Sequence, residues 1–388
     1  MVNKLRVGFP IFLASINMRA GFVLIGPLIP ILKDHFNLTT NQISLLAAIP
    51  LICFAGSSLI MGYVSRLGSS NKIITWALTV LSIALVARAF TGEIGLFLFS
   101  FALGVAIAVM NYEIPAWVKE HAPNDSGFMT GIYVTIMGVF AAISVAISVP
   151  LAESSSLSWR MAMVPWMVLA ILSALYWKIK MKSTGEVVLN KTPHFWSSKA
   201  FRNPIAWALV LFFGFESMAF YATATWFPTL LTTKGFSLSH AAIAVSVSGL
   251  IGSGVGIAVP HYIEKLRDPR IAIVLISAMM TFSFFMISVQ EGMILLLWLS
   301  LSNIGISIIF PIALLLCGSK SDSPEATRNI STMMQSLGYI LSSAGPLFMG
   351  TLHDHFNSWD AAMYGVVVLC LLQLVTGWIV GKPSKIEL

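Results

Sequence analysis

Two ionisable side chains lie deep inside long apolar runs of this 388-residue sequence. Arg19 lies about 12 residues into the first run, and Glu216 lies about 13 residues into the run at 204–232. At 1.5 Å per helical residue, each lies ~18 Å from the start of its run, near the middle of a bilayer. A charged side chain at that depth costs about 2.5–3.5 kcal/mol on insertion scales, and such residues usually face a cavity and mark a functional path.

The two side chains allow three interpretations. In the first, Arg19 binds an anionic solute while Glu216 carries a coupled proton. In the second, Arg19 and Glu216 pair with each other, and the solute or a proton breaks the pair. In the third, they form a static buried ion pair that holds the two halves of the protein in register. The pattern favours a functional role for both residues and leaves all three interpretations open.

Two further polar residues lie near the cytoplasmic end of the run at 94–117. Asn111 and Glu113 are two residues apart, so they project about 200° apart around a helix and cannot share one face. Glu113 is either a structural partner for a basic loop residue or an inner proton station. Asn111 is expected to line the vestibule or to bond across helices.

A polar stripe runs along the stretch at 328–351. Ser331, Gln335 and Tyr339 follow four-residue spacing, which places them on one face of a helix. Such a stripe can simply join neighbouring helices. The amide and the phenol, together with Tyr133, also make it a candidate for solute contact.

Two aromatic side chains of the run at 204–232 are candidates to stack on a planar solute. They are Tyr221 and Trp226. Trp226 precedes Pro228 near the outer face, where it fits an interfacial aromatic belt equally well.

The composition excludes the soluble classes of protein. The chain is 57% hydrophobic and 10% charged, whereas a soluble chain carries about 25% charge. Apolar stretches of roughly 20 residues recur to the end, and each can cross a hydrocarbon core of about 30 Å. The twelve runs lie near 7–32, 41–64, 73–90, 94–117, 127–152, 159–178, 204–232, 239–261, 269–288, 292–317, 328–351 and 359–381. We therefore expect an all-α integral membrane protein with twelve transmembrane helices.

The distribution of basic residues predicts the orientation. With the N-terminus inside, 18 of the 23 Lys and Arg residues fall in cytoplasmic segments. Outer segments hold Lys33, Arg88, Arg160 and Lys234. By the positive-inside rule both termini are cytoplasmic, and the basic excess reflects topology rather than nucleic-acid binding.

The two halves of the chain resemble each other at an offset of about 200 residues. Ser158-Trp159-Arg160-Met161-Ala162-Met163 matches Ser358-Trp359-Asp360-Ala361-Ala362-Met363. Residues 179–203 between the halves are polar and basic, which predicts a cytoplasmic linker. The expected domains are an N-terminal six-helix bundle over 1–178 and a C-terminal bundle over 204–388. In repeats of this kind, the solute site lies near the midplane between the halves.

Motifs in five of the runs carry a family resemblance. They are Asn17-Met18-Arg19, Gly104 to Lys119 with Asn111 and Pro115, Met129-Thr130-Gly131-Ile132-Tyr133, Phe212-Phe213-Gly214-Phe215-Glu216-Ser217, and Met334-Gln335-Ser336-Leu337-Gly338-Tyr339. Almost the whole chain resembles the cyanate/nitroimidazole transporter branch of the major facilitator superfamily. The resemblance implies two pseudo-symmetric six-helix bundles, alternating access and a bacterial cytoplasmic (inner) membrane. It also implies a cyanate-like anion or a planar heterocycle such as nitroimidazole as the solute, with Asn17 beside Arg19 in the site.

At three positions the residue differs from the one that the family pattern has. Ser65 replaces the aspartate usual in the loop between the second and third helices, so the charge relay of that loop motif cannot be carried over. Glu113 and Glu216 stand where the branch has apolar or amide residues. Both are candidates to change the coupling or the solute.

Motifs that would indicate ATP-driven transport, a metal site or an enzyme are absent from the sequence. The chain has no Gly-x-x-x-x-Gly-Lys-Ser/Thr phosphate loop, which argues against direct ATP drive. Its three cysteines fall in apolar runs, and it has no helical His-x-x-x-His, so we expect no metal, no cofactor and no enzymatic activity. The cluster His353-Asp354-His355 is expected to be a solvated turn rather than a metal site.

These observations predict a secondary active transporter, a proton-coupled symporter or antiporter. The candidate solute-binding residues are Arg19, Asn17, Asn111, Tyr133, Glu216, Tyr221, Trp226, Gln335 and Tyr339, and the proton-coupling candidates are Glu216 and Glu113. The expected partners are a small-molecule solute, protons and the lipid bilayer, without nucleic acid, and the expected state is a monomer. Two alternatives remain open: a proton-driven drug or metabolite exporter, and a transporter-like membrane solute sensor.

Overall fold

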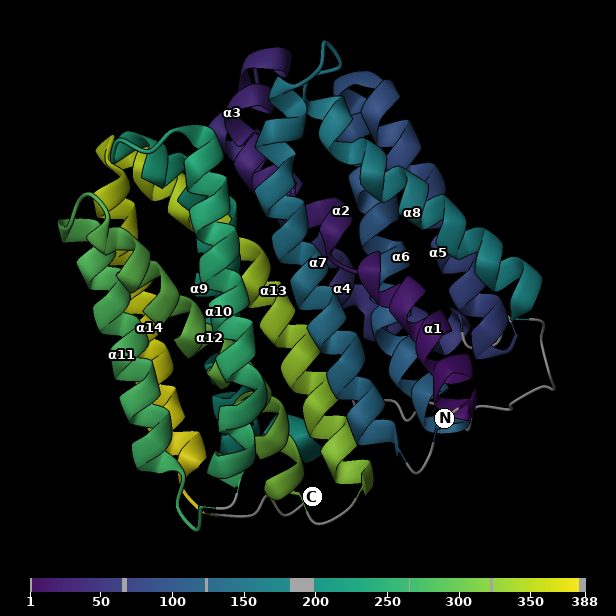
Figure 1. Cartoon of the computed structure of the whole chain (residues 1–388). Helices are drawn as coiled ribbons and strands as arrows, with labels where there is room; N and C mark the ends of the chain where they lie inside the picture. Colours follow the sequence, from purple (N-terminus) through teal and green to yellow (C-terminus); the bar gives the residue numbers. More distant parts are fainter. Residues whose placement is uncertain are drawn as a thin grey trace. The chain divides into compact units, whose positions relative to one another are not determined.

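Long α-helices account for most of the residues that the computed structural model describes, which are 2–64, 68–122, 125–181, 199–264, 266–321 and 324–383 (Figure 1). The helices are α1 (Val2–Ile16), α2 (Ala20–Val23), α3 (Ile25–Phe36), α4 (Thr40–Val64), α5 (Ser70–Phe90), α6 (Gly92–His121), α7 (Ser126–Glu153), α8 (Trp159–Lys180), α9 (Pro204–Thr233), α10 (Leu238–Glu264), α11 (Arg270–Val289), α12 (Ile294–Ser319), α13 (Pro324–Phe356) and α14 (Trp359–Gly381). The predicted all-α fold is confirmed.

The membrane-crossing helices agree with the predicted runs. Among the described residues, 10 helices are long and apolar enough to cross a membrane, and the bent pair Gly8–Val23 and Ile25–Phe36 makes 11 if it forms one span. The remaining predicted span corresponds to α13, which has 33 residues and carries the polar stripe. At ~50 Å, α13 is longer than a hydrocarbon core is thick, so it can serve as the twelfth span. Its polar side chains lower its mean hydropathy.

The chain forms two compact units. The first comprises Met1–Leu38 and Ile49–Thr192, and the second comprises Thr39–Ala48 and Pro193–Leu388. The first residues of α4 therefore belong to the second unit, where Ser44 Oγ donates a hydrogen bond to the carbonyl of Pro346 on α13 at 3.1 Å. Residues 182–198 of the predicted linker, and Ser65, lie outside the described residues.

Large aromatic side chains fill the core of the first unit, in which α5 packs against α6 and α8. Trp117 and Trp177 are each 1% exposed, and their rings meet with 5.5 Å between centroids. Both indole N–H groups donate inside the protein: Trp117 to Asn71 Oδ1 at 2.5 Å and Trp177 to the carbonyl of Pro10 at 3.3 Å. Trp117 and Trp177 thus contribute apolar area without leaving their donors unpaired.

Small residues let α10 and α12 of the second unit approach closely. A Cβ at Gly252 would lie 2.6 Å from the carbonyl oxygen of Asn303, and one at Gly256 would lie 2.5 Å from that of Ser307. The two glycines and their two partners are each four residues apart, the spacing of one helix face. Asn303 also donates to Ser248 Oγ on α10 at 3.2 Å. This helix pair therefore depends on close backbone contact.

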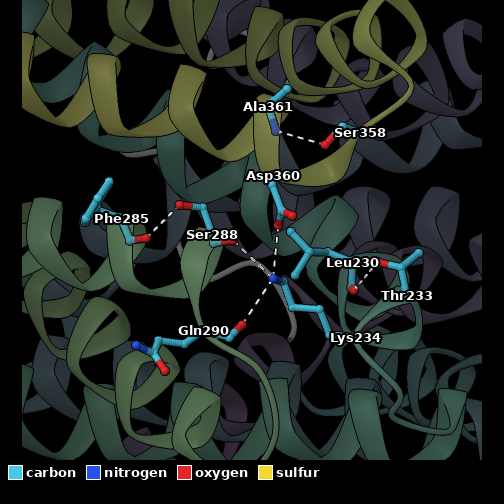
Figure 2. A network of polar contacts seen from close by, with 9 residues as sticks. All are labelled: Leu230, Thr233, Lys234, Phe285, Ser288, Gln290, Ser358, Asp360 and Ala361. Atoms are coloured by element: carbon cyan, nitrogen blue, oxygen red, sulfur yellow. Dashed lines mark hydrogen bonds and ion pairs between the residues drawn. The ribbon is translucent and has the colours of Figure 1, made fainter.

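A lysine joins three helix ends in the second unit (Figure 2). Lys234, which follows α9, lies 3.0 Å from Asp360 Oδ1 on α14 and donates to the carbonyls of Ser288 and Gln290, where α11 ends. Cations stabilise helix C-termini because the last carbonyls carry partial negative charge. In the first unit Arg160 Nε donates at 2.9 Å to the carbonyl of Ala89 near the end of α5. Both units thus place a cation at the C-terminal end of a helix.

The close contact of α10 with α12 yields a stability prediction. Gly252→Ala is expected to destabilise the protein by about 1–3 kcal/mol, because the added methyl group overlaps a backbone carbonyl that cannot move freely. Gly254→Ala in the same helix is the matched control, since a Cβ there meets nothing within 4 Å. Thermal unfolding in detergent measures both. Equal melting temperatures for the two variants would contradict close packing at Gly252.

Candidate functional site

The first membrane span is interrupted at Arg19. Residues 17–19 are not helical, and the amides of Asn17 and Met18 form tight turns with the carbonyls of Ala14 and Ser15. Beyond the interruption, the bent pair turns by 43° at Leu24. Two local features favour these breaks. Asn17 Nδ2 donates to the carbonyl of Leu13 at 2.7 Å and so competes with helical hydrogen bonds, and Pro27 has no N–H to donate to Val23.

Side chains from three other helices hold the interrupted segment. Asn17 Nδ2 donates to Ser173 Oγ of α8 at 2.9 Å, and Ser144 Oγ of α7 donates to the carbonyl of Ala20 at 2.8 Å. Arg88 Nη1 of α5 donates to the carbonyl of Gly21, also at 2.8 Å. Irregular backbone at membrane depth persists only where protein or water satisfies its polar groups. The side chains of α5, α7 and α8 meet that requirement here.

Arg19 differs from its neighbours in exposure. Every other residue from Ala14 to Phe22 is buried, whereas Arg19 is partly exposed. The backbone on both sides of Arg19 is held by the bonds of Asn17 and Ala20. Arg19 is therefore the one partly exposed residue in a segment from Ala14 to Phe22 whose backbone is held on both sides.

Glu216 lies in the interior of the second unit. It is 1% exposed, and its Oε2 accepts a hydrogen bond from Ser217 Oγ at 2.9 Å. Its helix α9 packs against α13 and α14. Since Arg19 and Glu216 belong to different units, the interpretations that pair them remain predictions.

Glu113 is a fully buried carboxyl group of the first unit. It is 0% exposed. Within the described part of the chain, neither of its carboxyl oxygens accepts a hydrogen bond. The hydroxyl of Ser70, the first residue of α5, lies near enough to interact electrostatically with it. Asn111 is exposed, in agreement with the predicted 200° separation.

The polar stripe of α13 is partly accessible. Gln335 Nε2 donates to Ser331 Oγ at 3.0 Å, which shows that these two residues share a face. The ring of Tyr339 packs edge-on against Phe213 of α9, with 5.3 Å between centroids. Gln335, Tyr339 and, in the first unit, Tyr133 are all partly exposed.

The aromatic candidates of α9 are more enclosed. Tyr221 is 6% exposed, and Trp226 is 2% exposed. The Trp226 indole donates to the carbonyl of Pro346 at 2.9 Å, and its ring lies 5.0 Å from that of Trp359. In this structure the Trp226 side chain is engaged in packing among α9, α13 and α14.

The burial of Arg88 was not predicted from the sequence. Arg88 was counted among the cations of the outer segments, and the structure shows it in the last turn of α5 with 1% exposure. An arginine near the end of an apolar run can either extend to the membrane surface or turn inward. No pattern in the sequence distinguishes the two, because the acceptor is a backbone carbonyl of another helix.

The chain is similar to known transport proteins over nearly its whole length. The chain is 26% identical to the 2-nitroimidazole transporter of Escherichia coli (strain K12), over 99% of this chain and 98% of that protein. It is 21% identical to the cyanate transport protein CynX of the same strain, over 93% of this chain and 94% of CynX.

A solved structure shows the same fold. The bacterial homologue of the human lysosomal transporter Spinster, in an inward-facing and occupied conformation, superposes with a TM-score of 0.84 at 15% identity. The match covers 99% of this chain and 98% of that one. The sequence profile of the Major Facilitator Superfamily matches residues 11–346. The chain is a multi-pass membrane transporter and belongs to the Major Facilitator Superfamily.

Proposed function

We propose that this transporter moves a small anion, or a planar heterocycle of the nitroimidazole type, with Arg19 as its polar anchor. The observation that carries the proposal is the partly exposed Arg19 between buried neighbours at an interruption of the first span. The relatives named for 2-nitroimidazole and cyanate support this solute class.

Arginine suits this role because its planar guanidinium offers several donors in a fixed geometry to a carboxylate or another oxyanion. A charge at membrane depth also interacts more strongly than it does in water. The held backbone around Arg19 reduces the conformational entropy that solute binding would cost. Asn17 contributes by orienting the segment, since its amide already bonds Leu13 and Ser173.

The partly exposed residues of α7 and α13 are the remaining proposed solute contacts. Gln335 supplies an amide, and Tyr133 and Tyr339 supply aromatic faces that suit a planar solute. Tyr221, Trp226 and Asn111 take a smaller part in this proposal, because the first two are buried and Asn111 lies on the exposed face of α6.

Proton coupling is assigned to Glu216 and Glu113. Burying a carboxylate charge costs several kcal/mol, so enclosing and exposing such a group can be coupled to the uptake and release of a proton. Both side chains are enclosed within their units. The proposed setting is a bacterial inner membrane with both termini in the cytoplasm, and the proposed state is a monomer.

Flux into proteoliposomes tests the anchor. Arg19→Ala is expected to lower the uptake of cyanate or 2-nitroimidazole at least tenfold, which corresponds to about 1.4 kcal/mol. Arg19→Lys should recover part of the loss, because it keeps the charge but not the planar fork. Arg270→Gln is the control: Arg270 begins α11 and pairs with Asp268.

Three outcomes would contradict the proposal. Full transport by Arg19→Gln together with failure of Glu216→Gln would favour an exporter. Binding without flux in either direction would indicate a sensor. Equal loss in the Arg270→Gln control would show that the effect is not specific to Arg19.

An imposed pH gradient tests the coupling. Glu216→Gln is expected to abolish gradient-driven accumulation while solute exchange without a gradient continues, because the amide fills the site but cannot exchange a proton. Glu113→Gln is tested in the same way, and the exposed Glu291→Gln serves as control. Wild-type accumulation by both variants would show that neither carboxyl carries the proton.

A further inference from the structure

Arg88 is a buried cation whose role the transport proposal does not yet include. Its Nη1 donates to the carbonyl of Gly21, and its Nε has no hydrogen-bond partner within the described part of the chain. Within the same ranges, no acidic side chain lies at ion-pair distance from it. A charge held in this way is expensive, so a purely structural donor would be easier to supply from a neutral side chain.

The helix that carries Arg88 is pressed against the interrupted segment. A Cβ at Gly21 would lie 3.0 Å from Leu85 Cδ2 of α5 and 3.5 Å from Leu103 Cδ1 of α6. Leu85 and Arg88 are one helical turn apart. One face of α5 therefore packs against Gly21 and also bonds its carbonyl.

The bonded peptide is close to the proposed anchor. Gly21 follows Arg19 by two residues, so their Cα atoms are at most about 7.6 Å apart. Ser144 holds the intervening carbonyl of Ala20. Hydrogen bonds to two successive carbonyls therefore fix the backbone beside Arg19, and with it the direction of the Arg19 side chain. One of the two donors is a cation, Arg88.

We propose that Arg88 is a positioning residue that orients Arg19 through the carbonyl of Gly21, and that its unpaired charge makes the site select anionic over uncharged solutes. The inference rests on the proposed function of Arg19. It assigns to α5 a residue that contributes to solute specificity without touching the solute.

Three substitutions separate the charge from the hydrogen bond. Arg88→Gln keeps a donor for Gly21 and removes the charge, Arg88→Lys keeps both with altered geometry, and Arg88→Met removes both. Arg270→Gln is the control, because Arg270 lies in the second unit and pairs with Asp268. The probes are cyanate and nitrate as anions and an uncharged nitroimidazole.

Concentration-dependent uptake into proteoliposomes is the measurement. Arg88→Gln is expected to raise the KM for the anions about tenfold and to leave the KM for the uncharged probe within about twofold, with Arg88→Lys close to wild type. The double variant Arg19→Ala/Arg88→Met should take up the anions about as poorly as Arg19→Ala alone, because Arg88 acts through Arg19. Arg270→Gln should leave the ratio of the anion KM to the KM for the uncharged nitroimidazole unchanged.

Other results overturn the inference. If Arg88→Gln leaves the anion KM unchanged, or raises the KM for both kinds of solute equally, the residue is only structural. In either case, a strong loss in Arg19→Ala would keep the proposed function intact. If Arg19→Ala itself transports normally, the proposed function fails and the inference fails with it. Should Arg88→Met not fold, the comparison of Arg88→Gln with Arg88→Lys still decides.

Discussion

A helix that stops inside a membrane must have its freed polar groups satisfied by other parts of the protein, and the first unit is organised around this constraint. α1 ends at Ile16 and α2 begins at Ala20. Side chains of α5, α7 and α8 bond Gly21, Ala20 and Asn17, respectively. Because water is absent from the hydrocarbon core, each of these bonds is harder to replace than at a protein surface.

The same constraint explains why Arg19 can be partly exposed. An arginine on a regular helix shares its backbone hydrogen bonds with the whole helix, and its exposure depends on how the helix rotates. Here the neighbouring carbonyls are fixed by Ser144 and Arg88, so the backbone direction at Arg19 is set locally. Interrupted helices that line solute sites near the midplane are a recurring device of membrane transporters.

The second unit is held together differently, with contacts that are mostly between regular helices. Gly252 and Gly256 bring α10 against the backbone of α12. Lys234 joins the ends of α9 and α11 to the start of α14 (Figure 2). Close packing and satisfied carbonyls stabilise helix association in lipid, where the hydrophobic effect between helices is absent.

The sequence predicts the helices well because a membrane span needs about 20 apolar residues, a constraint that is local in the chain. It also predicts that Arg19 is unusual, since a charge in an apolar run is visible without a structure. It could not predict the interruption itself, which depends on Ser144 and Ser173 arriving from distant helices. The burial of Arg88 could not be predicted either, because its partner is the backbone carbonyl of Gly21, a group that every residue carries. The burial of Glu113 and Trp226 likewise follows from packing rather than from periodicity.

A structure determined by electron cryomicroscopy with a bound anion would show whether Arg19 anchors the solute. We expect density for the anion within hydrogen-bond distance of the Arg19 guanidinium, with the carbonyls of Ala20 and Gly21 still bonded to Ser144 and Arg88. A first span that is continuous through residues 16–20, or an anion bound away from Arg19, would contradict it.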